Sequence, residues 1–423
     1  MGQLLFFLLL NTFLWNYHFK LGLNLYLSDF LGTALLAFTL VRWLRESPPS
    51  RYRPWLFLFI ALFIYYLFQV FYAYTLLGNS PNAIMGRARN LFFYPLLFFA
   101  GLTFTTNAAD MDKYILFTRV HVFISVLLGV LSLKFPALNP ARIYIEGDIV
   151  PAQYFMVVTH GTALLCCWLF IYEFINFARH GNARSFFFLG ITAVGIMGTQ
   201  NRSILATFII MIGLVFFYSR KAESPIKERM RIYLVFLLIL LVVGGFWLVQ
   251  SPLYEKFRER IHDTAAAFTG EEEFFNTNPG VRVGRTIATY KEWLKSPIIG
   301  CGWGNQITEF KIYDLRGNYV RTNYGTPHNY YITILYQVGL IGFLIMMVFY
   351  YRLYRSIKPG EPLYRKNIMV YSLFIFYVGF MVFNVANTHF YGDPVFIPVY
   401  FFLLGAMVSY SASFLPRTEE EHQ

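Results

Sequence analysis

Long apolar runs, each bounded by short polar or basic segments, recur along almost the whole chain. A helix needs about 20 mostly apolar residues to cross a bilayer, and the pattern predicts about 12 such helices. Their expected spans are 3–18, 23–44, 54–76, 84–105, 113–134, 151–177, 184–199, 201–219, 231–250, 328–351, 368–387 and 394–415. The predicted fold is therefore an all-α polytopic membrane protein.

One polar interval, 251–327, is long enough to form structure of its own. It divides the chain into helices 1–9 over residues 1–250, a loop between helices 9 and 10 over 251–327, and helices 10–12 with a short tail over 328–423. We expect no further domain.

Two helices are predicted within that loop. Apolar residues at helical spacing indicate an amphipathic helix lying at the membrane surface over 252–267. A second helix is expected to start after Asn278-Pro279-Gly280 and to stop at Ser296-Pro297. On this helix Arg282, Arg285 and Thr289 share a face.

Composition and loop charge agree with this class and give it an orientation. Hydrophobic residues make up 57% of the chain and charged residues 14%, which excludes an ordinary soluble globule. Lys and Arg gather in alternate loops, which the positive-inside rule assigns to the cytoplasm. These residues are Arg42, Arg45, Arg51, Arg53, Lys113, Arg179, Arg184, Arg220, Lys221, Lys227, Arg229, Arg231, Arg352, Arg355, Lys358, Arg365 and Lys366, against Lys20, Lys134 and Arg142 in the other loops. Both termini are expected inside, and the formal charge of +12 reflects topology and inner-leaflet contact rather than nucleic-acid binding.

No metal, redox or nucleotide site is predicted. Cys166 and Cys167 are adjacent in a membrane segment and Cys301 stands alone, so they form neither a disulfide framework nor a zinc site. The acidic run at 271–273 is read as a solvated loop, because three adjacent carboxylates cannot all face one ion. The sequence lacks a phosphate-binding G-x-x-x-x-G-K-[ST] loop, which argues against an ATP-driven pump. We expect no cofactor.

An unusual set of arginines falls at the predicted outer ends of helices, where few charges are expected. The set comprises Arg87, Arg89, Arg142, Arg202, Arg282 and Arg285. Guanidinium suits a pyrophosphate because it stays charged and forks onto two oxygens. The alternative for each is snorkelling or pairing with a nearby acid such as Asp29, Glu146, Asp148 or Asp393, or, for the two loop residues Arg282 and Arg285, simple solvation.

Two further features stand beside the tenth predicted helix. Gly300-Cys301-Gly302-Trp303-Gly304 follows no predicted strand and lacks an acidic ribose partner, so it is not a dinucleotide fingerprint. We expect a tight turn that a neighbour approaches closely, with backbone contact to a phosphate as the alternative. His328 stands at the outer mouth of the helix, about three turns above Gly339 on the same face, where glycine would let another helix pack. A helix cap or a hydrogen bond in the headgroup zone is the alternative role for His328, and His389 is a second candidate on the same side.

These motifs occur in an order that resembles a known family. Gly284-Arg285, Trp293, Pro297, the run 299–305, His328-Asn329 and Gly339-Leu340-Ile341-Gly342 are similar to the signature of the bacterial O-antigen ligase and O-antigen polymerase superfamily. The likeness covers residues 284–342, and the many-helix pattern with one long outer loop late in the chain extends it to the whole sequence.

The resemblance implies a GT-C-like glycosyltransferase of the bacterial inner membrane, with a periplasmic active site and no need for a nucleotide sugar or a metal. The implied donor is a glycan linked to undecaprenyl pyrophosphate. Arg285 and His328 match motif positions directly, and Arg202 matches less directly. We add Arg282, Arg142, Arg87 and Arg89 to the pyrophosphate-binding set from topology alone, together with His389.

The residues fit such a reaction. The developing charge of a departing lipid pyrophosphate needs fixed cations, which Arg202, Arg285 and Arg282 can supply. A neutral His328 imidazole can deprotonate a sugar hydroxyl of the acceptor near physiological pH. Because the sequence shows no carboxylate pair suited to a covalent glycosyl intermediate, inversion is expected.

Several functions share these features. A ligase would use lipid A-core as acceptor, a polymerase a second lipid-linked repeat, and a protein O-glycosylating relative a Ser or Thr hydroxyl. We prefer the ligase, because the outer loop is modest in size and no extra soluble domain is present. A lipid or anion transporter is the alternative of another class; it is disfavoured because the charges cluster at one face and Arg119 is the only obvious cation embedded in the inner half.

Overall fold

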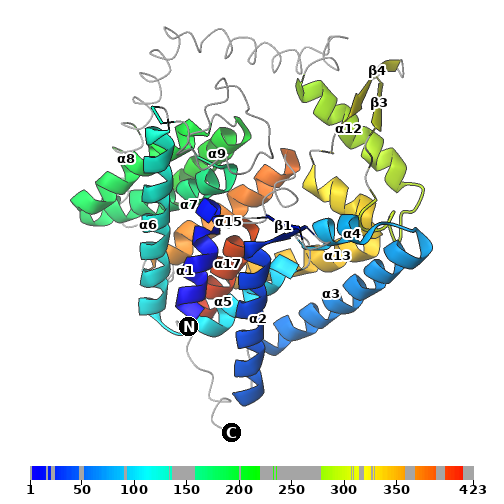
Figure 1. Ribbon diagram of the computed structural model, residues 1–423. Coiled ribbons are helices and arrows are strands. Elements are labelled where there is room, and N and C mark those ends of the chain that lie inside the picture. The colour runs from blue at the N-terminus through cyan, green and yellow to red at the C-terminus, as the bar shows by residue number, and fades with distance from the viewer. Residues whose placement is uncertain are drawn as a thin grey trace.

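The computed structural model describes residues 2–15, 18–20, 24–46, 52–89, 93–132, 134–135, 158–199, 202–219, 278–305, 309–313, 319–324, 329–357, 367–386 and 396–412, with the single residues 232, 235, 307 and 327. Long helices dominate this part of the chain (Figure 1). The predicted helices 231–250 and 252–267 lie outside the described residues.

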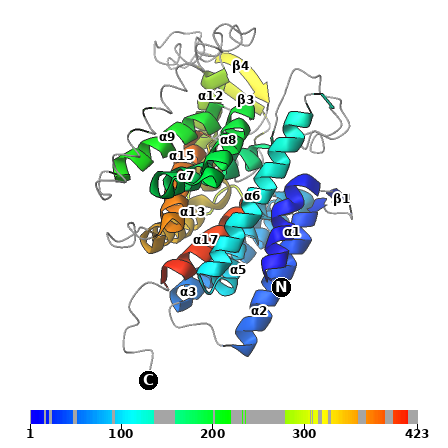
Figure 2. The same cartoon turned by 90° about the vertical axis from the view of Figure 1, so that its left-hand side faces the viewer.

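The first half of the chain supplies helices and one small hairpin. In order these are α1 (Gly2–Trp15), β1 (His18–Lys20), β2 (Asn24–Tyr26), α2 (Leu27–Arg45), α3 (Arg53–Phe71), the π-helix η2 (Tyr72–Leu76), α4 (Pro81–Ala88), the 3-10 helix η4 (Tyr94–Leu96), α5 (Leu97–Phe104), α6 (Ala108–Leu131), α7 (His160–His180), α8 (Ala183–Gly198) and α9 (Arg202–Ser219). Figure 2 shows α1 packed beside α2 and α6.

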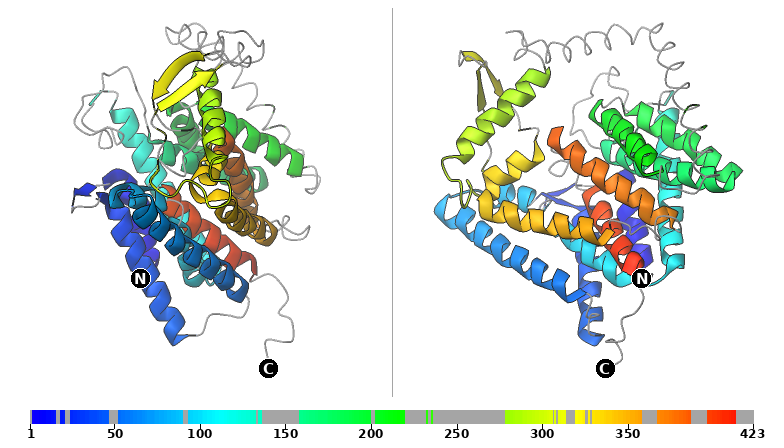
Figure 3. Two further views of the ribbon diagram at one scale, coloured as in Figure 1. Left: turned by 90° about the vertical axis from the view of Figure 1, so that its right-hand side faces the viewer. Right: turned by 180° about the vertical axis from the view of Figure 1, so that it is seen from behind.

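The second half begins with α12 (Asn278–Trp293) and the antiparallel strands β3 (Glu309–Tyr313) and β4 (Tyr319–Tyr324), followed by α13 (Tyr330–Ile357), α15 (Ile368–Ala386) and α17 (Phe396–Ala412). Figure 3 shows α12 and the β3–β4 hairpin beyond one end of the helical bundle. They occupy the region predicted to be the outer loop.

Local sequence explains where several helices begin and end. Asn107 and Asp110 form a capping box at the start of α6, each side chain accepting the other residue's backbone N–H. Gly181 ends α7 in the left-handed conformation with φ 65°, and Asn182 then caps α8 by accepting the N–H of Ser185 at 2.7 Å. This two-residue turn makes α7 and α8 an antiparallel pair.

Small residues let the central helices α5 and α17 approach closely. A Cβ placed on Gly101 would lie 2.7 Å from Ala406 N, and one on Gly405 would lie 3.0 Å from Leu102 N. Both distances are too short for a real side chain, so the two backbones are in contact, as small residues permit between membrane helices. Stacked aromatic rings, such as Phe6 on Phe402 at 4.5 Å between centroids, fill the surrounding core.

Six described helices are long and apolar enough to cross a membrane: Leu27–Arg45, Arg53–Leu76, Ala108–Leu131, His160–His180, Tyr330–Ile357 and Ile368–Val385. Shorter apolar helices cover Tyr94–Phe104, Ala183–Gly198, Ser203–Phe217 and Phe396–Ser411. The predicted class, a largely helical membrane protein, is confirmed. The count of about 12 spanning helices and the periplasmic position of the loop stay predictions.

Helix ends that the charge pattern predicts on one face do meet in the structure. Lys113 at the start of α6 donates to the Gln3 side chain at 3.1 Å. Tyr52, just before α3, contacts Ser409 Oγ on α17 at 2.9 Å, and Ser409 donates to Thr105 O at 2.7 Å. The side of the membrane on which these helix ends lie stays a prediction.

The structure differs from the predicted regular elements in several details. Within the predicted span 84–105, α4 and α5 differ in helix type from η4, and residues 90–92 between α4 and η4 lie outside the described residues. The β1–β2 and β3–β4 hairpins were not expected in an all-α chain. Finally, α13 is not regular, because Gly339 has the non-helical angles φ 65° and ψ −173°.

Candidate functional site

Helix α12 carries the two arginines predicted to bind a leaving group. It begins at Asn278, within the Asn-Pro-Gly sequence after which the start was predicted, and ends at Trp293, slightly before the predicted stop. Arg285 is half-buried and Arg282 is exposed, while Thr289, the third residue of the predicted face, is fully buried. Partial desolvation lowers the pKa of Arg282 from its usual value, yet a guanidinium stays protonated.

Arg285 is held against the β3–β4 hairpin. Its guanidinium carbon lies 5.7 Å from the centroid of the Phe310 ring, which is buried on β3. This is a cation–π contact, and it orients the planar group without using its N–H donors. Phe310 pairs with Asn323 in the register of the β3–β4 hairpin. This contact holds the Arg285 guanidinium against β3.

The glycine-rich loop after α12 adopts a backbone that other residues rarely adopt. Gly300, Gly302 and Gly304 have φ values of 86°, 81° and 82°. Alternate residues in the left-handed region make a compact turn that needs glycine at each position. The prediction of a tight turn with a closely approaching neighbour is confirmed.

That neighbour is the kink in α13. Cys301 N donates to Tyr336 O at 2.7 Å, and Gly302 N donates to Gln337 O at 3.0 Å. In the opposite direction, Leu340 N donates to Pro297 O at 2.9 Å. The loop thus supplies the hydrogen bonds that the kinked helix loses. These bonds also occupy two of the loop's amide groups, which weakens the alternative of a backbone phosphate cradle.

The partner at Gly339 differs from the one expected. A helix was predicted to pack there, but the approaching backbone belongs to the loop: a Cβ on Gly339 would lie 2.5 Å from Gly300 N. Helix packing does occur at Gly342, where the Tyr65 ring of α3 approaches. The kink also means that residues before and after Gly339 do not share the face of one regular helix.

Helix α3 supports the docked loop with two polar side chains inside the apolar region. Tyr65 OH donates to Val338 O at 2.5 Å, satisfying a carbonyl next to the kink. The Gln69 amide donates to Ile299 O and to Tyr65 OH, both at 2.8 Å. Buried polar groups of this kind are retained where their partners need a fixed position.

The other side of the loop rests on η2 and α4. A Cβ on Gly304 would lie 2.9 Å from Ile84 N. Asn79 donates to Trp303 O at 2.8 Å, and the buried Trp303 ring lies 4.6 Å from the Tyr66 ring centroid. The loop therefore joins α12, α13, α3 and α4 into one unit. Arg87 lies on α4, although its side chain is not described.

The start of α13 is defined by Asn329. Its side-chain oxygen accepts the N–H of Ile332 at 3.0 Å, and its carbonyl accepts the N–H of Thr333 at 3.0 Å. Asn329 is thus the N-cap, so the alternative that His328 caps the helix is disfavoured. His328 itself lies outside the described residues, between Asn329 and the buried Pro327.

Arg89 is placed in a different environment from Arg285. It is buried, its Nε lies 3.1 Å from Asp29 Oδ1, and its guanidinium stacks on the Tyr26 ring at 4.6 Å. Tyr94 OH donates to the same Asp29 oxygen at 2.8 Å. This favours pairing with a nearby acid, the structural alternative for Arg89.

The remaining predicted site residues are only partly placed. Arg202 is the first residue of α9, with no side-chain description, and Figure 1 shows α9 and α12 on different sides of the upper half of the molecule. Arg142 and His389 lie outside the described residues. Among the predicted pyrophosphate-binding arginines, the described structure thus groups Arg282 and Arg285 on α12 and connects their helix to α4.

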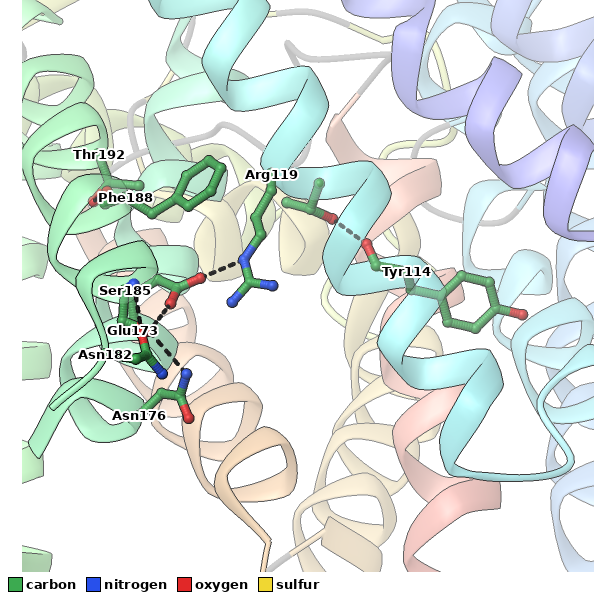
Figure 4. Close-up of polar contacts among 9 residues, drawn as sticks. Tyr114, Arg119, Glu173, Asn176, Asn182, Ser185, Phe188 and Thr192 are labelled. Atoms are coloured by element: carbon green, nitrogen blue, oxygen red, sulfur yellow. Dashed lines mark hydrogen bonds and ion pairs between the residues drawn. The ribbon is translucent and has the colours of Figure 1, made fainter. Parts of the chain in front are cut away.

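Arg119, the embedded cation noted in the sequence, has an acidic partner. Figure 4 shows its guanidinium reaching from α6 to Glu173 on α7, with 2.6 Å between Nε and Oε1. The second Glu173 oxygen accepts a hydrogen bond from the Ser185 hydroxyl at 2.6 Å, and the Asn176 amide donates to that hydroxyl at 2.8 Å. Arg119 and Glu173 are both buried. The network connects α6, α7 and α8 as a charge-compensated cluster.

Within the described ranges, no group of three or more His, Cys, Asp or Glu residues is arranged to hold a metal ion. Cys166 and Cys167 are buried and Cys301 is half-exposed, each as a free thiol. Burial raises the pKa of the Cys301 thiol, with the negative charge of Glu292 as a smaller cause.

Fold and site together define a polytopic α-helical membrane protein in which a basic helix, α12, is attached to the bundle by a glycine loop. The family described as O-antigen ligase matches residues 187–347, less than half of the chain. This match supports the chain as a member of the O-antigen ligase family and confirms the resemblance found in the sequence. The matched segment contains Arg202, Arg282, Arg285, the glycine loop and His328. No curated protein matches the chain.

Sequence reasoning missed several residues that build the site. Tyr65 and Gln69 were read only as part of an apolar span, although a Gln inside such a span signals a buried hydrogen bond. The alternation of Glu309 to Tyr313 and Tyr319 to Tyr324 around a polar turn was an available signal for the β3–β4 hairpin. Glu173 was a visible charge in a membrane segment and was not considered as the partner of Arg119.

Proposed function

We propose that this protein is an O-antigen ligase. It transfers a glycan from undecaprenyl pyrophosphate to a sugar hydroxyl of lipid A-core, at the periplasmic face of the bacterial inner membrane. The reaction is independent of metal and nucleotide and inverts the anomeric centre. The family match supports a glycosyltransferase-like enzyme of the O-antigen ligase and polymerase superfamily; donor, acceptor and stereochemistry are the proposal.

The observation that carries this proposal is the interlock between the glycine loop and the kink of α13. Cys301 and Gly302 donate to carbonyls before Gly339, while Leu340 donates back to Pro297. This contact fixes the end of α12 relative to α13, and so it connects Arg285 on one helix with the chain leading into Asn329 on the other. A catalytic set drawn from two segments needs such a rigid connection.

Arg285 and Arg282 are the proposed ligands of the departing pyrophosphate. As the glycosidic carbon–oxygen bond breaks, negative charge accumulates on the phosphate oxygen, and fixed guanidinium groups stabilise it more than they stabilise the ground state. Phe310 pre-orients Arg285 by stacking. Arg202, Arg87, Arg142 and His389 are proposed as further contacts, while Arg89 is assigned to holding Asp29.

His328 is the proposed general base. It takes the proton of the acceptor hydroxyl as that oxygen attacks the anomeric carbon, and undecaprenyl pyrophosphate leaves. His328 directly precedes the N-cap of α13 in sequence, and the positive end of a helix dipole disfavours imidazolium. A neutral imidazole can accept a proton near physiological pH.

The experiment is a transfer assay with purified protein in liposomes, undecaprenyl pyrophosphate glycan and lipid A-core, without nucleotide and with chelator. A larger lipopolysaccharide is the expected product. A second assay omits lipid A-core; growth of the lipid-linked glycan alone would identify a polymerase instead. Movement of the lipid without any new glycosidic bond would support the transporter alternative.

The base assignment has its own control. His328→Ala should abolish transfer while donor binding is retained, whereas Arg285→Ala should weaken both. Equal activity after His328→Ala would refute the base and leave the ligase function intact.

A further inference from the structure

Helix α12 exposes a stripe of large apolar side chains, here called the apolar stripe. It comprises Val283, Ile287, Tyr290, Leu294 and, just beyond the helix, Ile298, with exposed fractions between 39 and 60%. The first four follow one another at spacings of four, three and four residues, so they lie on one side of the helix. Leu294 N still donates to Tyr290 O at 3.2 Å, so the helical geometry holds to that residue. The stripe therefore runs the length of α12.

The stripe faces away from the protein. On the opposite side of the helix, Val281, Gly284 and Thr289 are buried. Arg285 is two residues from both Val283 and Ile287, and two residues correspond to about 200° of rotation about a helix axis. Its guanidinium accordingly lies against β3, away from the stripe. Thus α12 buries one face and leaves an apolar face uncovered by the described residues.

The apolar stripe continues onto a membrane-crossing surface. Ile341 N donates to Ile298 O at 3.3 Å, so the end of the stripe touches α13. From there Leu340, Ile341, Leu344 and Val348 are exposed along α13, one of the helices apolar enough to cross a membrane. Exposed apolar residues on such a helix face lipid. The apolar surface of α12 is therefore an extension of a lipid-facing surface.

The residues flanking the stripe suit the interface between lipid and water. The Tyr290 and Trp293 rings lie 5.4 Å apart, and Trp293 donates through Nε1 to Pro297 O at 3.1 Å. Tyr and Trp are enriched at this depth of a bilayer. Lys291 and Lys295 are exposed beside them, with stems long enough to reach phosphate groups; Lys295 Nζ also lies 2.7 Å from Glu292 Oε2, an exposed pair that costs little to exchange. Apolar, aromatic and basic positions together match a helix lying in the headgroup zone.

We propose that α12 is seated in the membrane leaflet on its own side of the bundle, with the apolar stripe among the upper acyl chains and Lys291 and Lys295 at the lipid phosphates. Phospholipid is thus the molecule that contacts the apolar stripe. If the proposed function holds, this seating also sets Arg282 and Arg285 at the depth where a lipid-linked pyrophosphate emerges; the seating itself does not depend on that function.

The test measures what surrounds the stripe in the full chain reconstituted in phospholipid vesicles. Cys301→Ala removes the half-exposed thiol, while Cys166 and Cys167 are fully buried and should not label. A nitroxide is then attached at Ile287→Cys or Leu294→Cys. Reference labels are placed at Leu344→Cys on the lipid-facing side of α13 and at Lys311→Cys, exposed on β3.

Collision rates with oxygen, which partitions into lipid, and with a water-soluble nickel complex give the outcome. Labels at 287 and 294 should show an oxygen-to-nickel ratio close to that at 344 and several-fold above that at 311. A ratio like that at 311 would place the stripe in water and overturn the proposal. Protection from both reagents would show that protein, either more of this chain or a second copy, covers the stripe, and would also overturn it.

Because the readout needs no substrate, it is independent of the transfer assay. Leu294→Glu gives a second measurement, since a carboxylate resists entry into lipid. The label at 287 should then become more accessible to nickel, while Lys311→Gln, on β3 and outside the stripe, should leave it seated. If the labels at 287 and 294 show the expected lipid contact but the protein transfers no glycan, the result counts against the proposed function alone.

Discussion

Gly300 and Gly339 lie backbone against backbone, and each has a positive φ, 86° and 65°. A Cβ on Gly300 would lie 2.6 Å from Gln337 O, so neither residue has room for a side chain. Two glycines separated by a strand hairpin and half a helix therefore form one structural element. This contact explains why the glycine loop and the Gly-Leu-Ile-Gly motif occur together in the sequence.

Gly339→Ala should destabilise the protein and reduce its activity. Alanine at this φ costs roughly 1 to 2 kcal/mol in backbone strain, and its methyl group would also displace the loop carbonyl of Ile298. Gly190→Ala on α8 is the matched control, because a Cβ there meets nothing within 4 Å. Thermal unfolding in detergent measures both. An unchanged melting temperature for Gly339→Ala would contradict the close contact.

Cys301 provides a native reporter of the docked loop. Burial and the nearby Glu292 carboxylate raise the pKa of its thiol, so less thiolate is present at any given pH. The rate of alkylation should therefore rise with pH around a midpoint above that of a small thiol. Gly339→Ala, by releasing the loop, should move that midpoint down and accelerate labelling. A midpoint already at the small-thiol value in the unaltered protein would show that Cys301 is solvated.

The sequence allowed the class of protein and the ends of α12 to be predicted, because both depend on local information. Apolar runs reveal membrane helices whatever their neighbours, and Asn278-Pro279-Gly280 marks a helix start by its own geometry. The partner of Gly339 could not be predicted in this way. Glycine indicates that something approaches closely, but whether that is a helix or the loop depends on the tertiary arrangement.

Dependence on the tertiary arrangement also explains why the sequence did not distinguish Arg89 from the other arginines. Arg87 and Arg89 look alike in sequence, two residues apart at one helix end. Asp29, the partner of Arg89, is distant along the chain, and only the packing of α2 near η4 brings it within 3.1 Å. Pro95, in contrast, is a local signal for the first turn of the 3-10 helix η4.

Arg285 should not tolerate replacement by lysine. A lysine at position 285 would keep the positive charge but lose the planar fork and the stacking on Phe310. Removing one fixed donor to a developing negative charge costs about 10²- to 10³-fold in rate, and we expect Arg285→Ala to reach that range, with Arg285→Lys recovering only part. Steady-state transfer kinetics measure the effect. Full activity in Arg285→Lys would show that charge alone is required.

Phe310→Leu is the matched control for Arg285. It removes the group that orients the guanidinium and keeps the guanidinium that would bind the pyrophosphate. The change keeps an apolar residue on β3 and removes the aromatic face, a contact worth about 0.5 to 1 kcal/mol at an exposed site. Activity should fall several-fold with Arg285 present and little further in the Arg285→Ala background. Independent losses in the two backgrounds would contradict a positioning role for Phe310.

Arg89 and Arg87 should behave differently despite their proximity. Breaking a buried ion pair costs about 3 to 5 kcal/mol, so Arg89→Ala should lower the melting temperature strongly, and less so when Asp29→Ala is also present. Arg87→Ala should instead raise the KM for the lipid-linked donor at unchanged stability. A stable Arg89→Ala variant with a raised KM for the donor would show that Arg89 binds the donor rather than stabilising the fold.

Glu173→Gln tests whether the Arg119 cluster is structural. Glutamine can still accept the Ser185 hydroxyl but cannot neutralise Arg119, so an unpaired charge remains buried and a loss of about 3 to 5 kcal/mol is expected. Ser185→Ala, which removes one hydrogen bond and keeps the ion pair, should cost about 1 kcal/mol. Replacing both charges, as in Arg119→Met with Glu173→Met, should recover most of the stability, because no charge then needs compensation. Transfer activity should recover with it. A stable but inactive double variant would show that the pair acts in the reaction or in movement of the lipid.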